Sequence, residues 1–367
     1  MTLNRVGILT GGGDCSGLNA VIRAITRAAI IQHNAKVIGI EDGFDGLIFG
    51  QYQELSIHNT KDILPLGGTI IGTTNKGNPF KYRERDENGT IQDYDYSNKA
   101  VANFKQLNLD CLFVLGGDGT LQIANRFHKI GLPVIEIPKT IDNDLKETDY
   151  SFGFHTAVQV ACDALDRLQT TGRSHDRIMI LEVMGRNSGW IALESGIAGG
   201  AHIILIPEIP YHLDIVLEKI RMREVGGSPY TIIVVAEAAS ELGGSQITTE
   251  NANERLQGVK RYGGVGAYLT EKIKNEIHQE VRYTVLGHTQ RGGTPISFDR
   301  ILGTRFGSFA VKAAAAKKFG NMVSLKTPNI ALTPLKSLAG LARTISPTDQ
   351  LIESAESIGI SLGRSVQ

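Results

Sequence analysis

The feature that most constrains the fold is a regular alternation of strand patterns and helix patterns along this 367-residue chain. The predicted strands are short apolar runs at residues 6–10, 36–41, 111–115, 133–137, 177–183, 202–207, 231–236, 281–286 and 322–326. The predicted helices have apolar residues at helical spacing and lie at residues 18–32, 121–129, 154–168, 190–198, 213–223, 263–277 and 297–319. Such alternation is typical of βαβ units with mostly parallel sheets. Because the strands outnumber what one sheet comfortably holds, we expect two α/β domains.

Composition excludes several classes of protein. Lys plus Arg and Asp plus Glu are equal at 38 each, so no overall charge draws the chain to nucleic acid or to a membrane surface. The three cysteines form no disulfide framework, which favours a reducing cytoplasm. We see no signal peptide and no apolar run near the ~18 residues of a membrane span. Any phosphate-binding site must therefore come from a local group of residues. The segment 78–98 is polar and charged, which predicts a surface loop or short hairpin.

Two glycine-rich loops follow predicted strands. Gly11–Asp14 comes after the first strand and precedes a helix, a place where backbone N–H groups bind phosphate, although a tight turn explains it equally well. Gly116–Thr120 follows the strand 111–115, and Asp118 within it is suited to hold Mg²⁺ on nucleotide phosphates. The alternative for this second loop is an ordinary Asp-Gly turn. In open α/β sheets, ligands bind at the carboxyl ends of strands, where both loops lie.

A third loop, Pro138–Asp144, follows the strand 133–137 and carries two acids. One acid can accept a proton from a hydroxyl nucleophile while the other orients it or a metal. Lys139 can neutralise charge on a transferring phosphoryl group. An Asx-rich turn that caps a helix is the alternative interpretation.

Cationic side chains gather near the strand ends of the second half. They are Arg177, Arg186 in Met184-Gly185-Arg186, Arg282, and both His288 and Arg291 in His288-Thr289-Gln290-Arg291. Arginine suits phosphate because its planar guanidinium donates two parallel hydrogen bonds. Glu237 ends the apolar strand 231–236 and can accept hydrogen bonds from sugar hydroxyls, or be a buried structural carboxylate. The group as a whole indicates a phosphorylated substrate.

These motifs occur in one order: GILTGGGDCSGLNAVIR, GGDGT, PKTIDND, RIMILEVMGR, VVAE and VRYTVLGHTQRGG. In that order they resemble the 6-phosphofructokinases of the bacterial type, from residue 6 to at least 320. The pattern is most similar to the branch that uses ATP in some members and pyrophosphate in others. The resemblance implies a Mg²⁺-dependent, cytoplasmic glycolytic kinase that phosphorylates the 1-hydroxyl of fructose 6-phosphate.

The resemblance also implies roles for single residues. Asp142 would be the general base, supported by Thr140, Ile141 and Asp144, with Lys139 and Arg186 as further catalytic residues. Asp118 would hold Mg²⁺. The donor would contact Gly12, Gly13, Asn75, Lys76, Gly117, Gly119 and Thr120. Fructose 6-phosphate would contact Met184, Gly185, Arg186, Glu237, His288 and Arg291.

Two arginines have a special place in this resemblance. Arg177 and Arg282 match positions that the family contributes from a neighbouring subunit. The resemblance therefore implies a homotetramer whose active sites are shared between subunits. It also implies two Rossmann-like three-layer α/β domains, with the donor bound by residues 1–153 plus about 291–342. Residues 154–290 plus about 343–367 would bind fructose 6-phosphate.

The identity of the donor depends on two positions. Pyrophosphate-using relatives have Lys at the position of Lys139, but they typically have Asp at the position of Gly119. Gly119 leaves space where the α-phosphate of a nucleotide passes, so we expect ATP, with pyrophosphate as the alternative. Asn75 departs from the Arg that ATP-specific relatives place there, and the neighbouring Lys76 is a point charge without the planar guanidinium.

Other functions stay open on the sequence alone. NAD and lipid kinases also carry GGDGT, but they lack the downstream MGR and GHxQR motifs. A non-catalytic subunit that binds sugar phosphate would be marked by loss of the base or metal Asp, and both Asp142 and Asp118 are present.

Overall fold

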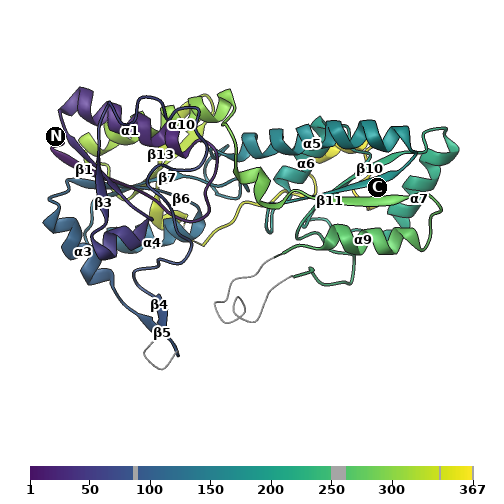
Figure 1. Ribbon diagram of the computed structural model, residues 1–367, viewed down its shortest axis with the longest axis horizontal. Helices are drawn as coiled ribbons and strands as arrows, with labels where there is room; N and C mark the ends of the chain where they lie inside the picture. The colour runs from purple at the N-terminus through teal and green to yellow at the C-terminus, as the bar shows by residue number, and fades with distance from the viewer. Residues whose placement is uncertain (86–89, 249–261, 339, 366–367) are drawn as a thin grey trace. The chain divides into compact units, whose positions relative to one another are not determined.

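The computed structural model describes residues 1–85, 90–248, 262–338 and 340–365, and the chain divides into two compact units (Figure 1). Unit 1 comprises Met1–Ile141, Leu145–Thr156 and Arg291–Ala342. Unit 2 comprises Asp142–Asp144, Ala157–Gln290 and Arg343–Gln367. Neither unit is one continuous stretch of chain, and the boundary passes through the third predicted loop, between Ile141 and Asp142.

Unit 1 is built on a seven-stranded sheet with the order β13-β12-β7-β6-β1-β2-β3. The five inner strands are parallel to one another, and the edge strands β3 and β13 are antiparallel to their neighbours. Their bounds are β1 (Arg5–Thr10), β2 (Lys36–Ile40), β3 (Tyr52–Leu55), β6 (Cys111–Gly116), β7 (Val134–Pro138), β12 (Asn321–Lys326) and β13 (Asn329–Pro334). Every residue of β6 is buried, as expected for a central parallel strand that is covered on both faces.

Helices cover both faces of this sheet, which makes three layers. One face packs against α2 (Phe44–Phe49), α3 (Ser97–Gln106), α4 (Asp118–Lys129) and the 3-10 turn η2 (Leu335–Ser337). The other face lies under α1 (Leu18–His33) and α10 (Ser297–Ala315), which lie side by side (Figure 1). Gly307 permits their close approach, because a Cβ there would lie 2.8 Å from both the Cβ of Ala24 and the carbonyl oxygen of Val21.

Unit 2 is built on a four-stranded parallel sheet with the order β11-β8-β10-β9. Its strands are β8 (Ile178–Val183), β9 (Ile203–Leu205), β10 (Thr231–Ala236) and β11 (Val281–Val285). Its helical elements are α5 (Phe154–Ser174), whose first turn belongs to unit 1, α6 (Trp190–Ala198), α7 (Leu213–Val225), α9 (Val265–Lys274), η1 (Gly287–Arg291) and α11 (Gln350–Ser357). The apolar faces of α7 and α9 pack on one side of the sheet, and α6 packs against β9 and β10.

The predicted α/β class with mostly parallel sheets is confirmed, and the polar segment 78–98 contains the hairpin of β4 (Tyr82–Arg85) and β5 (Ile91–Tyr94). The sequence analysis missed the edge strands β3 and β13 and the helices α2, α3 and α11. The predicted strand 202–207 is only Ile203–Leu205, and the predicted helix 297–319 ends at Ala315. Among the described helices, none combines the length and apolarity needed to cross a membrane.

Candidate active site

In unit 1, three residues predicted to bind the phosphoryl donor meet the predicted catalytic residue Lys139 around the loop after β1. A Cβ built on Gly12 would lie 3.4 Å from Lys139 Nζ, 3.7 Å from Thr120 Oγ1 and 3.9 Å from Asn75 Oδ1. Gly12 has a φ of 78°, a conformation that favours glycine, and its N–H donates to the carbonyl oxygen of Thr74 at 3.0 Å. The first, second and third predicted loops therefore converge on one point, while Asn75 and Lys76 stay exposed in the adjoining turn.

Lys139 supplies a buried cation to this point. Its side chain follows directly after β7, it is only 4% exposed, and Nζ donates to the carbonyl oxygen of Gly13. The Lys139 main-chain N–H donates to the carbonyl oxygen of Gly116 at 2.8 Å, which fixes the third loop against the second. A phosphate placed against Gly12 and Gly13 would thus meet an ammonium group that is already held in position.

Asp118 is the first residue of α4, where the helix dipole favours a negative charge. Its carboxylate accepts hydrogen bonds from Gln122 Nε2 at 2.8 Å and from the Gly340 N–H at 3.2 Å. A Cβ built on Gly117 would lie 3.3 Å from the carbonyl oxygen of Lys139, whereas a Cβ on Gly119 would meet no atom of the described residues within 4 Å. This fits a Mg²⁺ site, because the ion is usually bound by one or two carboxylates together with substrate phosphates.

In unit 2, the predicted base and two predicted sugar-binding residues lie together at the carboxyl ends of β8 and β10. Arg186 Nε is 3.9 Å from Asp142 Oδ2, and the Arg186 N–H donates to Glu237 Oε1 at 2.9 Å. Asp142 is 4% exposed, whereas the Arg186 side chain is 66% exposed. The turn that carries Arg186 is tight: φ is 142° at Gly185 and 51° at Arg186. A buried acid therefore faces an accessible cation, with Glu237 anchoring the loop between them.

The pKa of Glu237 is raised to about 7. Burial is the main cause, because it disfavours the charged form, and the negative charges of Asp142 and Glu182 add to it. Hydrogen bonds from the N–H groups of Arg186 and Gly185 act in the opposite direction. Glu237 consequently changes its protonation state near neutral pH.

The motif His288–Arg291 is divided between the two units. In unit 2, Gln290 is 1% exposed and its Oε1 accepts the N–H of Met184 at 2.8 Å, while the nearby His288 is exposed. In unit 1, Arg291 Nη1 donates to the carbonyl oxygen of Asp14 at 3.1 Å. A shared role for His288 and Arg291 at the 6-phosphate stays a prediction.

Arg177 and Arg282 lie near the amino ends of the unit 2 strands. Arg186 and Glu237 lie beyond the carboxyl ends, on the opposite side of the sheet along the strand direction. Arg177 directly precedes β8, Arg282 is the second residue of β11, and both pair with Glu280. Six residues of β8 separate the two ends by roughly 20 Å, at about 3.3 Å per residue. The structure therefore does not bring these two arginines to the Asp142 site of the same chain.

Hydrogen bonds to main-chain carbonyl oxygens hold the residues on either side of Asp142 in place. The carbonyl oxygen of Thr140 accepts from Ser151 Oγ at 2.8 Å, and Ile141 is 1% exposed. The carbonyl oxygen of Asp144 accepts the N–H of Arg343 at 2.7 Å. Sequence reasoning gave no role to Arg343, Gln290 or Glu208; of these, only Gln290 lay inside a recognised motif.

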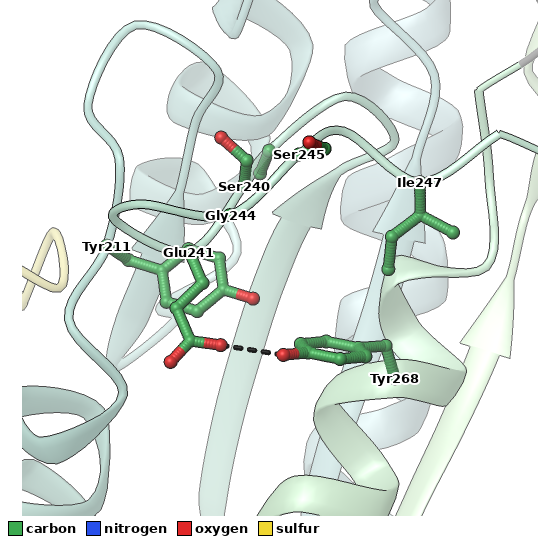
Figure 2. A pocket seen from close by; sticks show the side chains of 8 residues that line it. Tyr211, Ser240, Glu241, Gly244, Ser245, Ile247 and Tyr268 are labelled. Carbon is green, nitrogen blue, oxygen red and sulfur yellow. Dashed lines mark hydrogen bonds between the residues drawn. The ribbon is translucent and has the colours of Figure 1, made fainter.

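A pocket of about 380 Å³ lies farther along the loop that begins at Glu237 (Figure 2). In Figure 2 the hydroxyl of Tyr268 meets the carboxylate of Glu241, at 2.7 Å, with Tyr211 beside them. Tyr211 also exchanges main-chain hydrogen bonds with this loop, donating to Ser240 and accepting from Leu242. These contacts fix the loop that follows Glu237 against α9.

Two α/β units with glycine-rich and acidic loops at the carboxyl ends of parallel strands define a phosphate-binding protein of the Rossmann-like class. The fold is similar to that of a Pichia pastoris phosphofructokinase in the T-state, with a TM-score of 0.78 and 29% identity. That alignment covers 98% of this chain and 37% of the longer yeast chain. The family model named phosphofructokinase matches residues 5–314, and this chain belongs to that family.

Two curated relatives are similar over nearly their whole length. One, named ATP-dependent 6-phosphofructokinase 2, from Clostridium perfringens, is 48% identical over 98% of both chains. Another, from Amycolatopsis methanolica, is named pyrophosphate–fructose 6-phosphate 1-phosphotransferase; it is 44% identical over 94% of this chain and 96% of its own. The predicted family is confirmed, and relatives with both donors are similar to this chain.

Proposed function

We propose that this chain is an ATP-dependent 6-phosphofructokinase, a phosphotransferase that converts fructose 6-phosphate to fructose 1,6-bisphosphate in glycolysis. The observation that carries the proposal is the grouping of Asp142, Arg186 and Glu237 at one edge of the unit 2 sheet. A buried carboxylate beside an accessible guanidinium suits proton removal from a hydroxyl near a charged substrate. Family membership and the relative from Clostridium perfringens support the reaction and its substrates.

In the proposed reaction, Asp142 accepts the proton of the 1-hydroxyl as the oxygen attacks the terminal phosphoryl group. Arg186, 3.9 Å from Asp142, stabilises negative charge at the same place, and Glu237 accepts hydrogen bonds from sugar hydroxyls. Met184 and Gly185 line the sugar phosphate, His288 and Arg291 bind its 6-phosphate, and Thr140, Ile141 and Asp144 support the base. Catalysis then depends on positioning and electrostatics, without a covalent enzyme intermediate.

The donor is assigned to unit 1. Lys139 offers an ammonium to its phosphates beside Gly12 and Gly13, and Gly117, Thr120, Asn75 and Lys76 would surround them. Asp118 would hold Mg²⁺, which shields phosphate charge when it is bound. The open space at Gly119 supports ATP as the donor, since a Cβ there would meet no atom in the part of the chain that the structure describes.

Pyrophosphate stays the second candidate donor. The buried ammonium of Lys139 against Gly13 suits a short, highly charged donor, and the relative from Amycolatopsis methanolica is named for pyrophosphate. The space beside Gly119 argues for the longer nucleotide, because no side chain of the described residues fills it.

The site is proposed to be shared between subunits of a homotetramer. Arg177 and Arg282 lie at the far edge of the unit 2 sheet, about 20 Å from Arg186, so they would serve the Asp142 site of a neighbouring chain. The edge strand β11 supports such an interface. Its exposed residues include Tyr283 at 48% and Val285 at 50%, so this edge strand offers apolar surface that a neighbouring chain could cover.

The proposed function is tested by measuring fructose 1,6-bisphosphate formation from fructose 6-phosphate and Mg²⁺, with ATP and pyrophosphate in parallel. The Asp142→Ser variant serves as the control for contaminating kinases. Turnover with ATP alone is expected. Turnover with pyrophosphate would reassign the donor, and binding of fructose 6-phosphate without turnover on either donor would favour a non-catalytic regulatory subunit.

A further inference from the structure

The C-terminal part of the chain returns to unit 2 at Arg343 and touches the two loops that the proposed reaction needs. The N–H of Arg343 donates to the carbonyl oxygen of Asp144 at 2.7 Å, two residues from the proposed base. The guanidinium of Arg343 lies over the ring of Trp190, the first residue of α6, with Cζ 4.5 Å from the ring centroid. One residue thus joins the Asp142–Asp144 loop to the start of α6.

Glu208 makes the second connection. It follows β9 by three residues, and Oε1 accepts the N–H of Ile345 at 3.0 Å. Both carboxylate oxygens also lie 3.1 Å from the N–H of Gly189, the residue before α6. Glu208 therefore ties the C-terminal segment to the end of the Met184–Gly189 loop, which carries Arg186.

The loop between these tethers has little freedom. The N–H of Ser188 donates to the carbonyl oxygen of Gly185 at 3.0 Å, and Gly185 has a φ of 142°. A Cβ on Gly185 would come within 2.4 Å of the Ser188 carbonyl oxygen. A displacement of Gly189 is consequently passed through a closed turn to Arg186 and its contact with Asp142.

We infer that Glu208 and Arg343 are positioning residues, and that residues 343–345 act as a strap that sets the distance between Arg186 and Asp142. The inference rests on the proposed function. It reaches beyond it because neither residue lies in a phosphate-binding motif, and neither has a role in the proposed reaction. Trp190 contributes by packing, since its ring is 7% exposed beneath the guanidinium.

The C-terminal segment 343–365, called the tail here, is also attached to the unit 2 sheet near its far end, which limits movement of the strap. The N–H of Ile204 in β9 donates to the Ser361 carbonyl oxygen at 2.9 Å, and the N–H of Ser361 donates back to His202 at 3.0 Å. The tail is therefore attached at one end to the strand that leads into Glu208, and at the other end to the loop of the proposed base. Between them, Ile345 is 2% exposed and anchors the strap in the protein interior.

The test compares Glu208→Ala with a matched control in the same tail. Glu208→Ala should raise the KM for fructose 6-phosphate and lower kcat, together reducing kcat/KM by about 10- to 100-fold, because small displacements of reacting groups have effects of this size. The KM for ATP should change less than twofold, because the proposed donor residues belong to unit 1. Arg364→Ala breaks a tail ion pair with Glu356, 2.9 Å long, which touches neither loop. It should lower the melting temperature and leave both KM values unchanged.

A double-mutant cycle and direct binding complete the design. Arg343→Ala and Glu208→Ala should be non-additive in kcat/KM for fructose 6-phosphate, whereas Arg343→Ala and Arg364→Ala should be additive. Calorimetric titration of fructose 6-phosphate without a donor should show weaker binding to Glu208→Ala, with Glu208→Gln intermediate. Equal loss of fructose 6-phosphate and ATP affinity, or loss of stability alone, would overturn the inference. An inactive wild-type chain that binds no fructose 6-phosphate would instead overturn the proposed function.

Discussion

At the scale of single residues, Asp142 is the side chain on which the proposed chemistry depends most. It is buried, and it lies 3.9 Å from Arg186 in an ion pair. Asp142→Ser should lower kcat by about 10²–10⁴-fold, since this is the usual contribution of a positioned general base. The KM for fructose 6-phosphate should stay within a few fold, because a base acts mainly in the transition state. Steady-state kinetics with coupled detection of the bisphosphate would check it, and near-normal kcat would show that another group takes the proton.

Gly119 determines the space available to a nucleotide. A carboxylate introduced there would lie in the open region beside Asp118. This carboxylate would repel the α-phosphate of ATP, since two like charges about 4 Å apart repel by about 4 kcal/mol near a protein surface. We therefore expect Gly119→Asp to raise the KM for ATP by at least about tenfold, each tenfold being about 1.4 kcal/mol, with a smaller effect on any turnover with pyrophosphate. Gly119→Ala is the control for side-chain volume. An equal effect of the Asp variant on both donors would contradict the steric account.

Glu237 should make fructose 6-phosphate binding sensitive to pH. Its pKa of about 7 means that the carboxylate, the form that accepts hydrogen bonds from sugar hydroxyls, is lost as pH falls through 7. The KM for fructose 6-phosphate should therefore rise between pH 8 and pH 6. Glu237→Gln carries no ionisable group at this position and should show a high KM with a flatter profile. Because the substrate phosphate also titrates, the comparison between the two proteins is the measurement that decides.

The positions that sequence reasoning located well are those at the ends of parallel strands. Gly12, Thr120 and Lys139 come from separate predicted loops, and they converge because parallel strands end at one edge of a sheet. Glu208 and Arg343 could not be found this way. Their partners lie far away in the sequence, so only the tertiary fold makes them neighbours.

At the scale of elements, β7 carries an unusual side chain. Glu136 is completely buried, its register partners are Val114 in β6 and Met322 in β12, and its two carboxylate oxygens have no hydrogen-bond partner among the described residues. Burial raises its pKa well above the ordinary value; Lys139 lowers it to a lesser extent, and Asp118 raises it further. The carboxyl group is thus protonated in the folded protein at pH values where the unfolded chain has lost the proton.

This difference predicts a stability that falls with increasing pH. A group with a raised folded-state pKa contributes fully below its unfolded pKa, near 4.5, and loses that contribution as pH rises through the folded value. Relative to Glu136→Gln, the wild-type free energy of unfolding should decrease by about 1.4 kcal/mol per pH unit within that window. Urea unfolding of both proteins at pH 5 and pH 8 would measure it. A constant difference between the two proteins at both pH values would show that Glu136 ionises normally.

The elements that the sequence pattern missed share a physical cause. The edge strands β3 and β13 have interrupted apolar patterns. An edge strand has a partner strand on one side only, and its other side faces solvent. The short helices α2 and α11 span six and eight residues, too few for a helical period to stand out. By contrast, the continuous apolar runs of β6, β8 and β10 made the central strands plain to predict.

At the scale of the whole molecule, the proposal of shared active sites makes an unusual prediction. Asp142→Ser and Arg177→Ala should each be nearly inactive alone. Co-expressed in one oligomer, they should recover part of the wild-type activity, since some sites would combine an intact Asp142 with an intact Arg177 from the other chain. Mixing Asp142→Ser with Glu237→Ala is the control and should recover nothing, because both groups come from the same unit. Absence of recovery in a proven mixed oligomer would place each site within one chain.

The discontinuity of unit 1 has a consequence for synthesis on the ribosome. Strand β7 is completed early, but its neighbour β12 is residues 321–326, so β7 remains an open sheet edge while most of unit 2 is being translated. An exposed edge invites pairing with another nascent chain, and an inward-pointing charge is a known protection against this. In water, Glu136 on that edge is ionised. The same carboxyl group that is neutral in the finished core would thus disfavour pairing of β7 with another nascent chain until Met322 in β12 pairs beside it.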